Sequence, residues 1–445
     1  MDPSIEKHIA HWKRDEMLVQ TLYLDNHAEL IVQDTNGIER QDRIELDTEI
    51  LMPVETIYLS HNQVIVPSDI VDCTPEVLLS ELMQYYQDNL LIDEEVSVLM
   101  TGYTLYTWFY DKTHTAPYIY IQGDKGTAKS RILDLMSHTC FNAASLGAAV
   151  TEANIYRMQE ISRGTMVIDE LEPDFTGKSN QLTQILNNGY KQDGIIMRSE
   201  RMSTGGFKPV PFYVFGPKVI ASRSKPEDDA LRSRCFLIRT TEKKLSEVRK
   251  HNIPLEFTTS ARKTALQLRN KLLGLRFGYY EQMPCNFEQS QSESLTPRAA
   301  QIIDSILSVV PEEWLPGLRI ALENHLFEDG ISIARKNERL VQDVISRLSH
   351  ELAPEPGTPV KISYANICDK IMLIEGLQFT SKDVGSIVAN LGFEAVRTSS
   401  GMEVIYRNVG NVANVGEIEA CDTDNVEDVA NVEEHMPADV DCSMQ

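Results

Sequence analysis

The sequence predicts an α/β fold in which helices alternate with the strands of a parallel sheet between residues 117 and 240. Three apolar, β-prone runs support this fold class. The first, at 117–121, leads into a glycine-containing loop and a helical pattern; the second ends in an acidic pair at 169–170, and the third ends at Ser222. Apolar runs that end in polar residues, with helical segments between them, are typical of βαβ units.

Residues 1–73 predict a small β-rich N-terminal domain, because short apolar runs alternate there with turns such as Asn36-Gly37. The expected strands are 18–24, 29–32, 55–59 and 63–66. His8 and His11 lie at helical spacing without a third metal ligand, so we expect both at the surface.

The core is expected to span residues 74–240 and to begin with two helices, at about 75–90 and 93–110. Thr74 suits the N-cap of the first helix and Pro75 suits its first turn.

A phosphate-binding loop is predicted between the first strand and the helix after it. It consists of Gly123, Asp124, Lys125, Gly126, Thr127, Ala128, Lys129 and Ser130. Glycines let backbone N–H groups turn toward an anion, and a helix N-terminus adds partial positive charge. Lys129 is expected to reach the β- and γ-phosphates of a nucleoside triphosphate, and Ser130 to ligate Mg²⁺. Ala128 replaces the usual glycine, and it fits if this position has helical φ and ψ.

The acidic pair comes 40 positions after the loop lysine, at Asp169-Glu170. Asp169 is expected to hold Mg²⁺ through its water shell, and Glu170 to polarise the attacking water of an ATPase. Ser222 is expected either to contact the γ-phosphate or the water, or to be an ordinary cap of the third strand.

Two arginines precede the next apolar strand. Arg234, with Arg232 as second choice, is expected to act as an arginine finger on a neighbouring subunit; the alternative is a salt bridge on the subunit surface.

A hairpin is predicted just before the third strand, because Gly205-Gly206 separates two β-prone runs. Its candidate phosphate contacts are Arg198, Arg201 and Lys208.

Residues 241–352 predict a helical lid and linker region, and residues 353–407 predict two helices and a hairpin in a winged-helix-like domain. Lys382, Arg397 and Arg407 are its candidate DNA contacts, although such domains also dock proteins. The tail at 408–445 has ten acidic residues and no lysine or arginine, which predicts disorder; a DNA mimic and a docking site for a partner protein both fit it.

Composition narrows the functional classes. The net charge is −24, yet 15 Lys and Arg face only six Asp and Glu between residues 218 and 276, which fits either a DNA-tracking surface or a solvated helix face. The seven cysteines form no Cys-x-x-Cys pair, so a zinc or disulfide framework is not supported. No apolar run is long enough for a membrane span and no signal-peptide layout is seen, so a cytoplasmic protein without membrane partners is expected.

These motifs resemble those of the minichromosome-maintenance replicative helicases. The loop at 123–130 also has alanine before its lysine, the strand at 164–170 resembles their acidic motif, the hairpin resembles their pre-sensor-1 hairpin, and 231–236 is similar to their Ser-Arg-Phe arginine-finger motif. The match covers residues 115–240, and the layout is also similar to AAA+ helicase-like proteins of phages, plasmids and integrated elements. Ser222 stands where asparagine is usual in this family, and Cys235 interrupts its Arg-Phe pair.

The resemblance implies an AAA+ P-loop ATPase that uses ATP and Mg²⁺, forms a homo-oligomeric ring, expected to be hexameric, and moves along single-stranded or forked DNA during replication of a mobile element or phage. Two other functions stay open. One is a nucleotide-switched DNA-binding initiator or loader, and the other is a degenerate scaffold, which the intact Lys129, Ser130, Asp169 and Glu170 disfavour.

Overall fold

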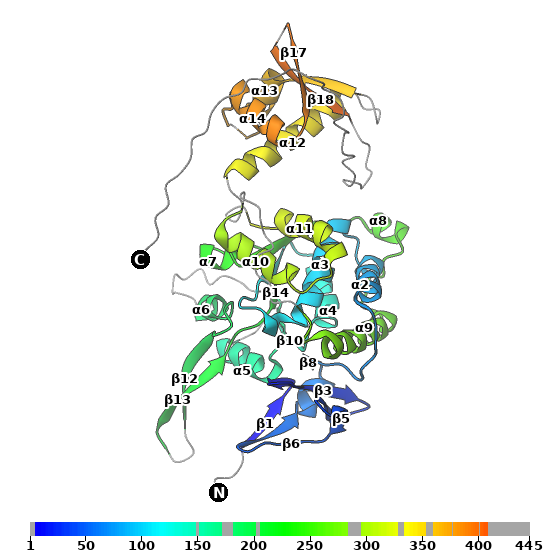
Figure 1. The fold of residues 1–445 in the computed structure, drawn as a ribbon, viewed down its shortest axis with the longest axis vertical. Coiled ribbons are helices and arrows are strands. Elements are labelled where there is room, and N and C mark those ends of the chain that lie inside the picture. The colour runs from blue at the N-terminus through cyan, green and yellow to red at the C-terminus, as the bar shows by residue number, and fades with distance from the viewer. Residues whose placement is uncertain are drawn as a thin grey trace, which may run out of the picture. The chain divides into compact units, whose positions relative to one another are not determined.

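The computed structural model describes residues 5–147, 151–170, 181–201, 205–283, 295–327, 333–352, 359–375, 377–399 and 401–407. The chain divides into two compact units, residues 1–337 and 338–445. Each unit is described by itself (Figure 1). The five finer segments expected from the sequence stay predictions.

A six-stranded sheet forms the centre of the first unit, in the order β15-β9-β14-β11-β10-β8. The bounds are β15 Cys235–Arg239, β9 Tyr118–Gln122, β14 Lys218–Ser222, β11 Met166–Ile168, β10 Ala143–Leu146 and β8 Val64–Ile65. The first five strands pair in parallel, as predicted, and β8 is antiparallel to β10. Because β14 lies between β9 and β11, the ends of all three strands meet at one edge of the sheet.

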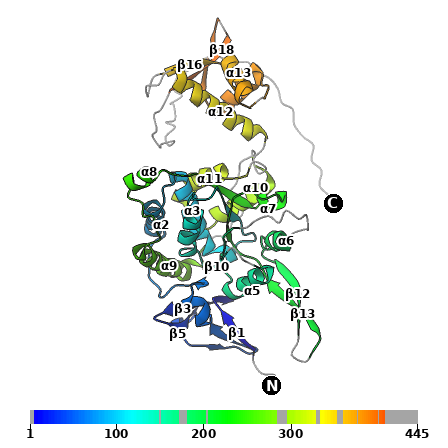
Figure 2. The ribbon, with the colours of Figure 1, turned by 180° about the vertical axis from the view of Figure 1, so that it is seen from behind.

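Helices surround this sheet (Figures 1 and 2). They are α2 Pro75–Asn89, α3 Glu94–Thr107, η1 Tyr110–Lys112, α4 Lys129–Ser137, α5 Glu152–Ser162, α6 Gln181–Asn188, α7 Asp229–Arg232, α8 Leu245–Lys250, α9 Thr259–Tyr279, α10 Pro297–Leu307, η2 Glu312–Trp314 and α11 Leu315–Asn324. Helix α3 is buried along most of its length because α2, α10 and α11 contact it. The side chains of Thr258 and Thr296 cap α9 and α10.

The N-terminal region is rich in strands, and two of the four expected strands are corrected. Its sheets are β2-β3-β4-β5 and β1-β7-β6, with bounds β1 Ile5–Ile9, β2 His11–Arg14, β3 Met17–Leu24, β4 His27–Asp34, β5 Gly37–Gln41, β6 Ile44–Glu45 and β7 Glu49–Pro53. The run expected as a strand at 55–59 is the short helix α1 Thr56–Ser60. The run expected at 63–66 contains β8, which joins the edge of the core sheet instead of the N-terminal sheets.

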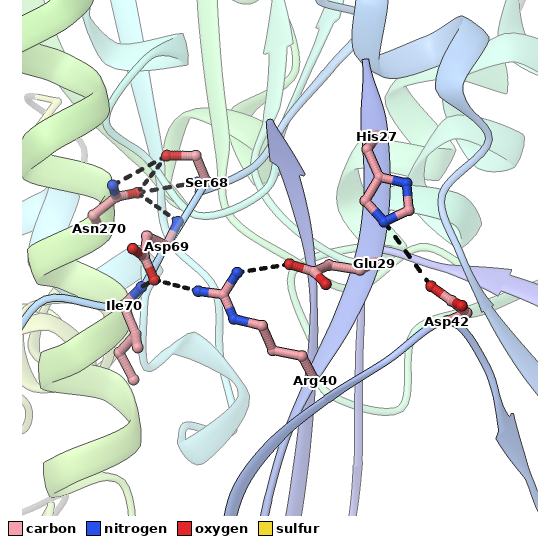
Figure 3. A network of polar contacts seen from close by, with 8 residues as sticks. All are labelled: His27, Glu29, Arg40, Asp42, Ser68, Asp69, Ile70 and Asn270. Carbon is pink, nitrogen blue, oxygen red and sulfur yellow. Dashed lines mark hydrogen bonds and ion pairs between the residues drawn. The ribbon is translucent and has the colours of Figure 1, made fainter. Parts of the chain in front are cut away.

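Polar contacts fix the N-terminal sheets to the helical layer (Figure 3). Arg40 on β5 donates hydrogen bonds to Glu29 at 2.7 Å and to Asp69 at 2.5 Å. The side-chain oxygen of Asn270 on α9 accepts from the backbone N–H groups of Ser68 at 3.0 Å and Asp69 at 3.2 Å. These contacts link β4 and β5 to α9 across about 200 positions of sequence.

His11 is also part of this junction, so the expectation that it is a surface residue was wrong. Its side chain is buried, and its ring centroid lies 5.0 Å from that of Phe141. Burial lowers the pKa of His11 to about 3. His8, in contrast, is exposed, and its Nδ1 lies 2.8 Å from the carbonyl oxygen of Pro53.

The predicted hairpin is present as β12 Ile195–Arg201 and β13 Phe207–Tyr213. Gly205 and Gly206 have φ of +85° and +88°, a conformation that glycine adopts without steric cost. Both views show the two-stranded ribbon projecting from the core alongside α5 (Figures 1 and 2).

Lys218 anchors the base of this ribbon to the sheet. It is the first residue of β14, its side chain is buried, and its ammonium donates to the carbonyl groups of Gly189 at 3.4 Å, Val214 at 3.1 Å and Gly216 at 2.8 Å. Burial lowers the pKa of Lys218 to about 7. The end of α6, the end of β13 and the start of β14 are therefore tied together at one point.

The second unit has three helices and a small antiparallel sheet. Its elements are most of α12 Ile333–Leu352, β16 Pro359–Ser363, α13 Tyr364–Glu375, α14 Ser381–Asn390, β17 Glu394–Thr398 and β18 Gly401–Arg407. The sheet order is β16-β18-β17, and a capping box between Thr380 and Asp383 starts α14. The expected helices and hairpin of 360–407 are thus present, with strand β16 as an addition.

The acidic tail at 408–445 and residues 284–294 of the expected lid and linker region lie outside the described residues. No helix of the described part of the chain is both long and apolar enough to cross a membrane.

Candidate nucleotide-binding site

The predicted phosphate loop connects β9 to α4, at the edge of the sheet where the strands end. Gly123 is required there, because a Cβ atom would lie 2.1 Å from the Thr240 hydroxyl oxygen. Thr127 fixes the other side of the loop, since its hydroxyl lies 2.7 Å from that of Thr240 and donates to the Asp124 carbonyl at 2.8 Å. The residue after β15 therefore holds the loop in place.

The backbone conformation of Ala128 differs from the expected helical one. It is the N-cap of α4, with φ of 66° and ψ of 16°, so it lies in the left-handed region instead of the helical region. Gly126 also has a positive φ, of +84°. Left-handed residues turn successive N–H groups toward one point and so favour an anion, but alanine adopts this conformation at a steric cost.

Lys129 turns back over the loop. Its ammonium donates to the carbonyl groups of Gly123 and Asp124, each at 2.7 Å. These two carbonyls hold the positive charge at the mouth of the loop, where phosphate oxygens of a nucleotide could accept from the same ammonium.

The two residues expected to hold Mg²⁺ lie together. The Ser130 hydroxyl donates to a carboxylate oxygen of Asp169 at 3.3 Å. Hydroxyl and carboxylate oxygens are ligands that Mg²⁺ accepts, and this cation usually keeps several of its waters. The donor set at this point therefore fits a hydrated Mg²⁺ bound to nucleotide phosphates.

Glu170 follows in a left-handed conformation, with φ of 53°. Its carboxylate accepts a hydrogen bond from Arg223 at 3.2 Å. Arg223 comes directly after β14, and the sequence reasoning missed it because it chose the strand's last residue, Ser222. Ser222 is buried and does not line the cavity described next, whereas Arg223 does.

A cavity of about 690 Å³ opens beside the loop. Its lining includes residues 125–131 and five charged side chains, Asp169, Glu170, Arg223, Arg239 and Lys243. Apolar side chains also line it, namely Ile92, Val96, Ile238, Leu245, Val248, Ile253 and Leu255. Its volume is in the range of small-molecule sites, and a lining that combines charged and apolar side chains suits a nucleotide.

The two expected arginine-finger residues do not line this cavity. Arg232 donates to the carbonyl groups of Pro226 at 2.8 Å and Glu227 at 2.9 Å and forms an ion pair with Asp229. Arg234 donates to the Ala230 carbonyl, and its guanidinium lies 5.2 Å from the centroid of the Tyr190 ring.

Arg298, which the sequence did not point to, contacts the same side chain, Tyr190. Its guanidinium is 5.0 Å from the Tyr190 ring centroid, and it donates to Gln301 at 2.7 Å. Burial and the neighbouring Arg298 both lower the pKa of Arg234. Two like charges around one ring form a candidate anion contact that no local sequence signal indicates, because the residues are far apart in the chain.

The hairpin cations occupy different faces of the ribbon. Arg198 points toward α5, where its guanidinium lies 5.5 Å from the Tyr156 ring centroid. Arg201 and Lys208 are exposed near the glycine turn. In the second unit, Lys382 on α14 and Arg397 on β17 are exposed, and the side chain of Arg407 lies outside the described residues.

Comparisons with known proteins add no family name. No family model and no curated protein matches the chain. Among solved structures, the apo NrS-1 C-terminal region is 12% identical, with 88% of this chain and 97% of that chain covered and a TM-score of 0.32. A full-length MCM homolog from Methanopyrus kandleri is 12% identical, with 72% and 75% covered and a TM-score of 0.35. These scores are too low for either likeness to bear on the chemistry of the site.

Proposed function

We propose that this chain is an ATP hydrolase of the AAA+ P-loop type that uses Mg²⁺ and acts on DNA. The observation that carries the proposal is the contact of Ser130 with Asp169 beside the turned-back Lys129, in the lining of a cavity that has both charged and apolar side chains. The Ser130–Asp169 contact joins residues that are 39 positions apart, and the ammonium, hydroxyl and carboxylate are groups that triphosphate chemistry needs.

In this proposal Lys129 and the N–H groups of residues 125–130 hold the β- and γ-phosphates, and Ser130 and Asp169 hold Mg²⁺. Mg²⁺ bound by Ser130 and Asp169 would supply neutralisation of the charge on the phosphate oxygens. Glu170 accepts the proton of the attacking water once its carboxylate leaves Arg223. The apolar side chains around Val96 and Ile253 exclude water from the base of the nucleotide.

The test is steady-state ATP hydrolysis by the purified chain and two variants. Lys129→Ala should abolish nucleotide binding and turnover, and Glu170→Gln should retain binding while it abolishes turnover. Glu281→Gln, which changes an exposed glutamate outside the cavity, is the matched control. Turnover at the wild-type rate in either site variant would refute the proposal.

We further propose that the chain works as a ring, expected to be hexameric, in which Arg234 and Arg298 complete the site of the next protomer. Both guanidinium groups lie outside their own protomer's cavity and within about 5 Å of one ring centroid. Arg232, held by three acceptors on its own loop, is the second choice.

Subunit mixing tests the ring. Lys129→Ala and Arg234→Ala should each be inactive alone. An equal mixture should recover about a quarter of the wild-type rate, because only interfaces with an intact site and an intact finger work. A mixture as inactive as its parts would show that Arg234 does not act across an interface.

The proposed work is ATP-driven movement along single-stranded or forked DNA in a cytoplasmic replication process of a mobile element or phage. The projecting ribbon with Arg201 and Lys208 supports a DNA contact, as does the helix–helix–hairpin order of the second unit, which we interpret as winged-helix-like with Lys382 and Arg397 exposed. The second candidate is an initiator or loader. Displacement of one strand of a forked duplex with ATP distinguishes them, because only a motor releases the strand.

A further inference from the structure

The ribbon formed by β12 and β13 has two unlike faces. Ile196 and Phe212 face α5 and are buried, with the Phe212 ring centroid 4.5 Å from that of Tyr156. The opposite face carries Ile195, Met197 and Phe207, which are 52%, 55% and 73% exposed. The first face fixes the ribbon, and the second is an apolar surface with no partner among the described residues.

Phe207 lies at the end of this surface, next to positive charge. It pairs directly with Arg201 across the ribbon, and Lys208 follows it. Among the described residues, neither Arg201 nor Lys208 has a carboxylate within ion-pair distance; Glu200 is instead paired with Arg157 at 3.1 Å. Phe207 and Arg201 share one face of the ribbon, and Lys208, paired with Glu200, lies on the other face at the same end. An exposed aromatic ring beside an arginine, with a lysine at the same end of the ribbon, suits a ligand with both a planar apolar group and negative charge.

The edge of β13 disfavours a protein strand as that ligand. The backbone N–H of Tyr213 points away from β12, because it donates to Glu160 at 2.8 Å. Positions 209 and 211 point the same way by alternation, and both are prolines without an N–H group. On the other edge, the Met197 carbonyl accepts from the Arg198 side chain at 3.2 Å. Positions 209, 211 and 213 of β13 therefore offer no free N–H donor to a further strand.

We propose that Phe207 stacks on a base of an unpaired nucleic-acid strand whose phosphates contact Arg201 and Lys208. The inference rests on the proposed action on DNA and adds the side chain that stacks on the bases of the strand. The bases of a duplex are already stacked on one another, whereas an unpaired strand offers its base faces to a protein ring. Every base has a flat face that can stack on an aromatic ring, so this contact does not depend on the nucleotide sequence.

The test is the binding of fluorescein-labelled oligothymidylate and of a duplex of equal length to the full chain, by fluorescence anisotropy. Phe207→Ala should weaken binding of the single strand by roughly five- to a hundredfold, the range for loss of one stacked base. Phe207→Trp should retain it, and Phe207→Leu should behave like alanine because it lacks a ring face. Ile195→Ala, on the same face but at the base of the ribbon, is the matched control.

Other outcomes separate this inference from the proposal beneath it. If the wild-type chain binds neither nucleic acid, the proposed action on DNA fails and stacking fails with it. If the wild type binds single strands and Phe207→Ala or Phe207→Leu binds them equally well, stacking alone is overturned.

An equal loss of affinity for the duplex in Phe207→Ala overturns the preference for an unpaired strand. A smaller sedimenting species for Phe207→Ala overturns the proposal in favour of a contact between copies of the chain. Unchanged basal ATP hydrolysis in Phe207→Ala is expected, since Phe207 does not line the cavity.

Discussion

The Ser130 hydroxyl donates a hydrogen bond to the Asp169 carboxylate at 3.3 Å, although 39 positions separate the two residues. The contact forms because α4 starts and β11 ends at the same edge of the sheet, with β14 between β9 and β11. It brings a hydroxyl and a carboxylate to one point, and both are oxygen ligands that suit a hydrated Mg²⁺ on a nucleotide.

Ser130→Ala should raise the Mg²⁺ concentration needed for half-maximal ATP hydrolysis by about tenfold or more, because contacts around a bound metal typically contribute 10- to 100-fold in affinity. Ser130→Thr keeps the hydroxyl and should stay close to the wild type. A Mg²⁺ titration of the hydrolysis rate measures both variants. An alanine variant with the wild-type Mg²⁺ dependence would exclude Ser130 from the metal site.

Ala128→Gly should stabilise the folded chain by about 1 kcal/mol. The φ of 66° costs alanine about 1–2 kcal/mol, and glycine removes this cost. The greater conformational entropy of glycine in the unfolded chain offsets part of the gain. Ala300→Gly in α10 is the control, since it should destabilise by a similar amount in an ordinary helix. Urea unfolding midpoints give both values. Destabilisation by both substitutions would contradict the left-handed conformation of Ala128.

Arg223→Ala should raise basal ATP turnover by at most about fivefold, because it frees Glu170 from an ion pair whose side chains are 57% and 45% exposed. Exposed pairs contribute only about 0.2–1 kcal/mol. The turnover number at saturating ATP is the measurement. A loss of turnover instead would show that Arg223 contacts phosphate during hydrolysis.

Arg276→Ala should destabilise the chain by about 3 kcal/mol or more, because it leaves the Asp111 carboxylate, which is only 16% exposed, with the Tyr280 hydroxyl but without its ion-pair partner. Burial would raise the pKa of Asp111, but Arg276 holds it down to about 2. Lys271→Ala on the same helix removes a partly exposed pair with Glu81 and should cost less than about 1 kcal/mol. Equal losses of the free energy of unfolding would contradict this ranking.

Acidification from pH 6.5 toward pH 4 should lower stability, because His11 and His138 are buried. Burial holds their pKa values at about 3 and about 4, below the ordinary 6.5. In this window the unfolded chain binds protons that the folded chain does not, so stability rises with pH and is lost as pH falls. His11→Gln should flatten the difference between urea midpoints at pH 7.5 and pH 5.5. His8→Gln, at an exposed position, should leave that difference unchanged.

The candidate site could be predicted from the sequence where its signals are local. The loop at 123–130 and the pair at 169–170 each follow an apolar strand. A strand, the point where it ends and the start of the next helix can all be predicted from a window of about ten residues. The hairpin was predicted for the same reason, since Gly205-Gly206 allows the positive φ of its turn. Arg223 and Arg298 were missed because their roles depend on partners contributed by other strands and helices.

The sequence by itself determined which segments are strands and helices around the phosphate loop, because those preferences arise from neighbouring residues. Only the tertiary structure decided that 64–65 pairs with the core sheet, that His11 is buried against Phe141, and that Ala128 takes a left-handed conformation. Each of these outcomes depends on long-range packing and pairing, in which apolar burial and backbone hydrogen bonds outweigh the local preferences of a few residues.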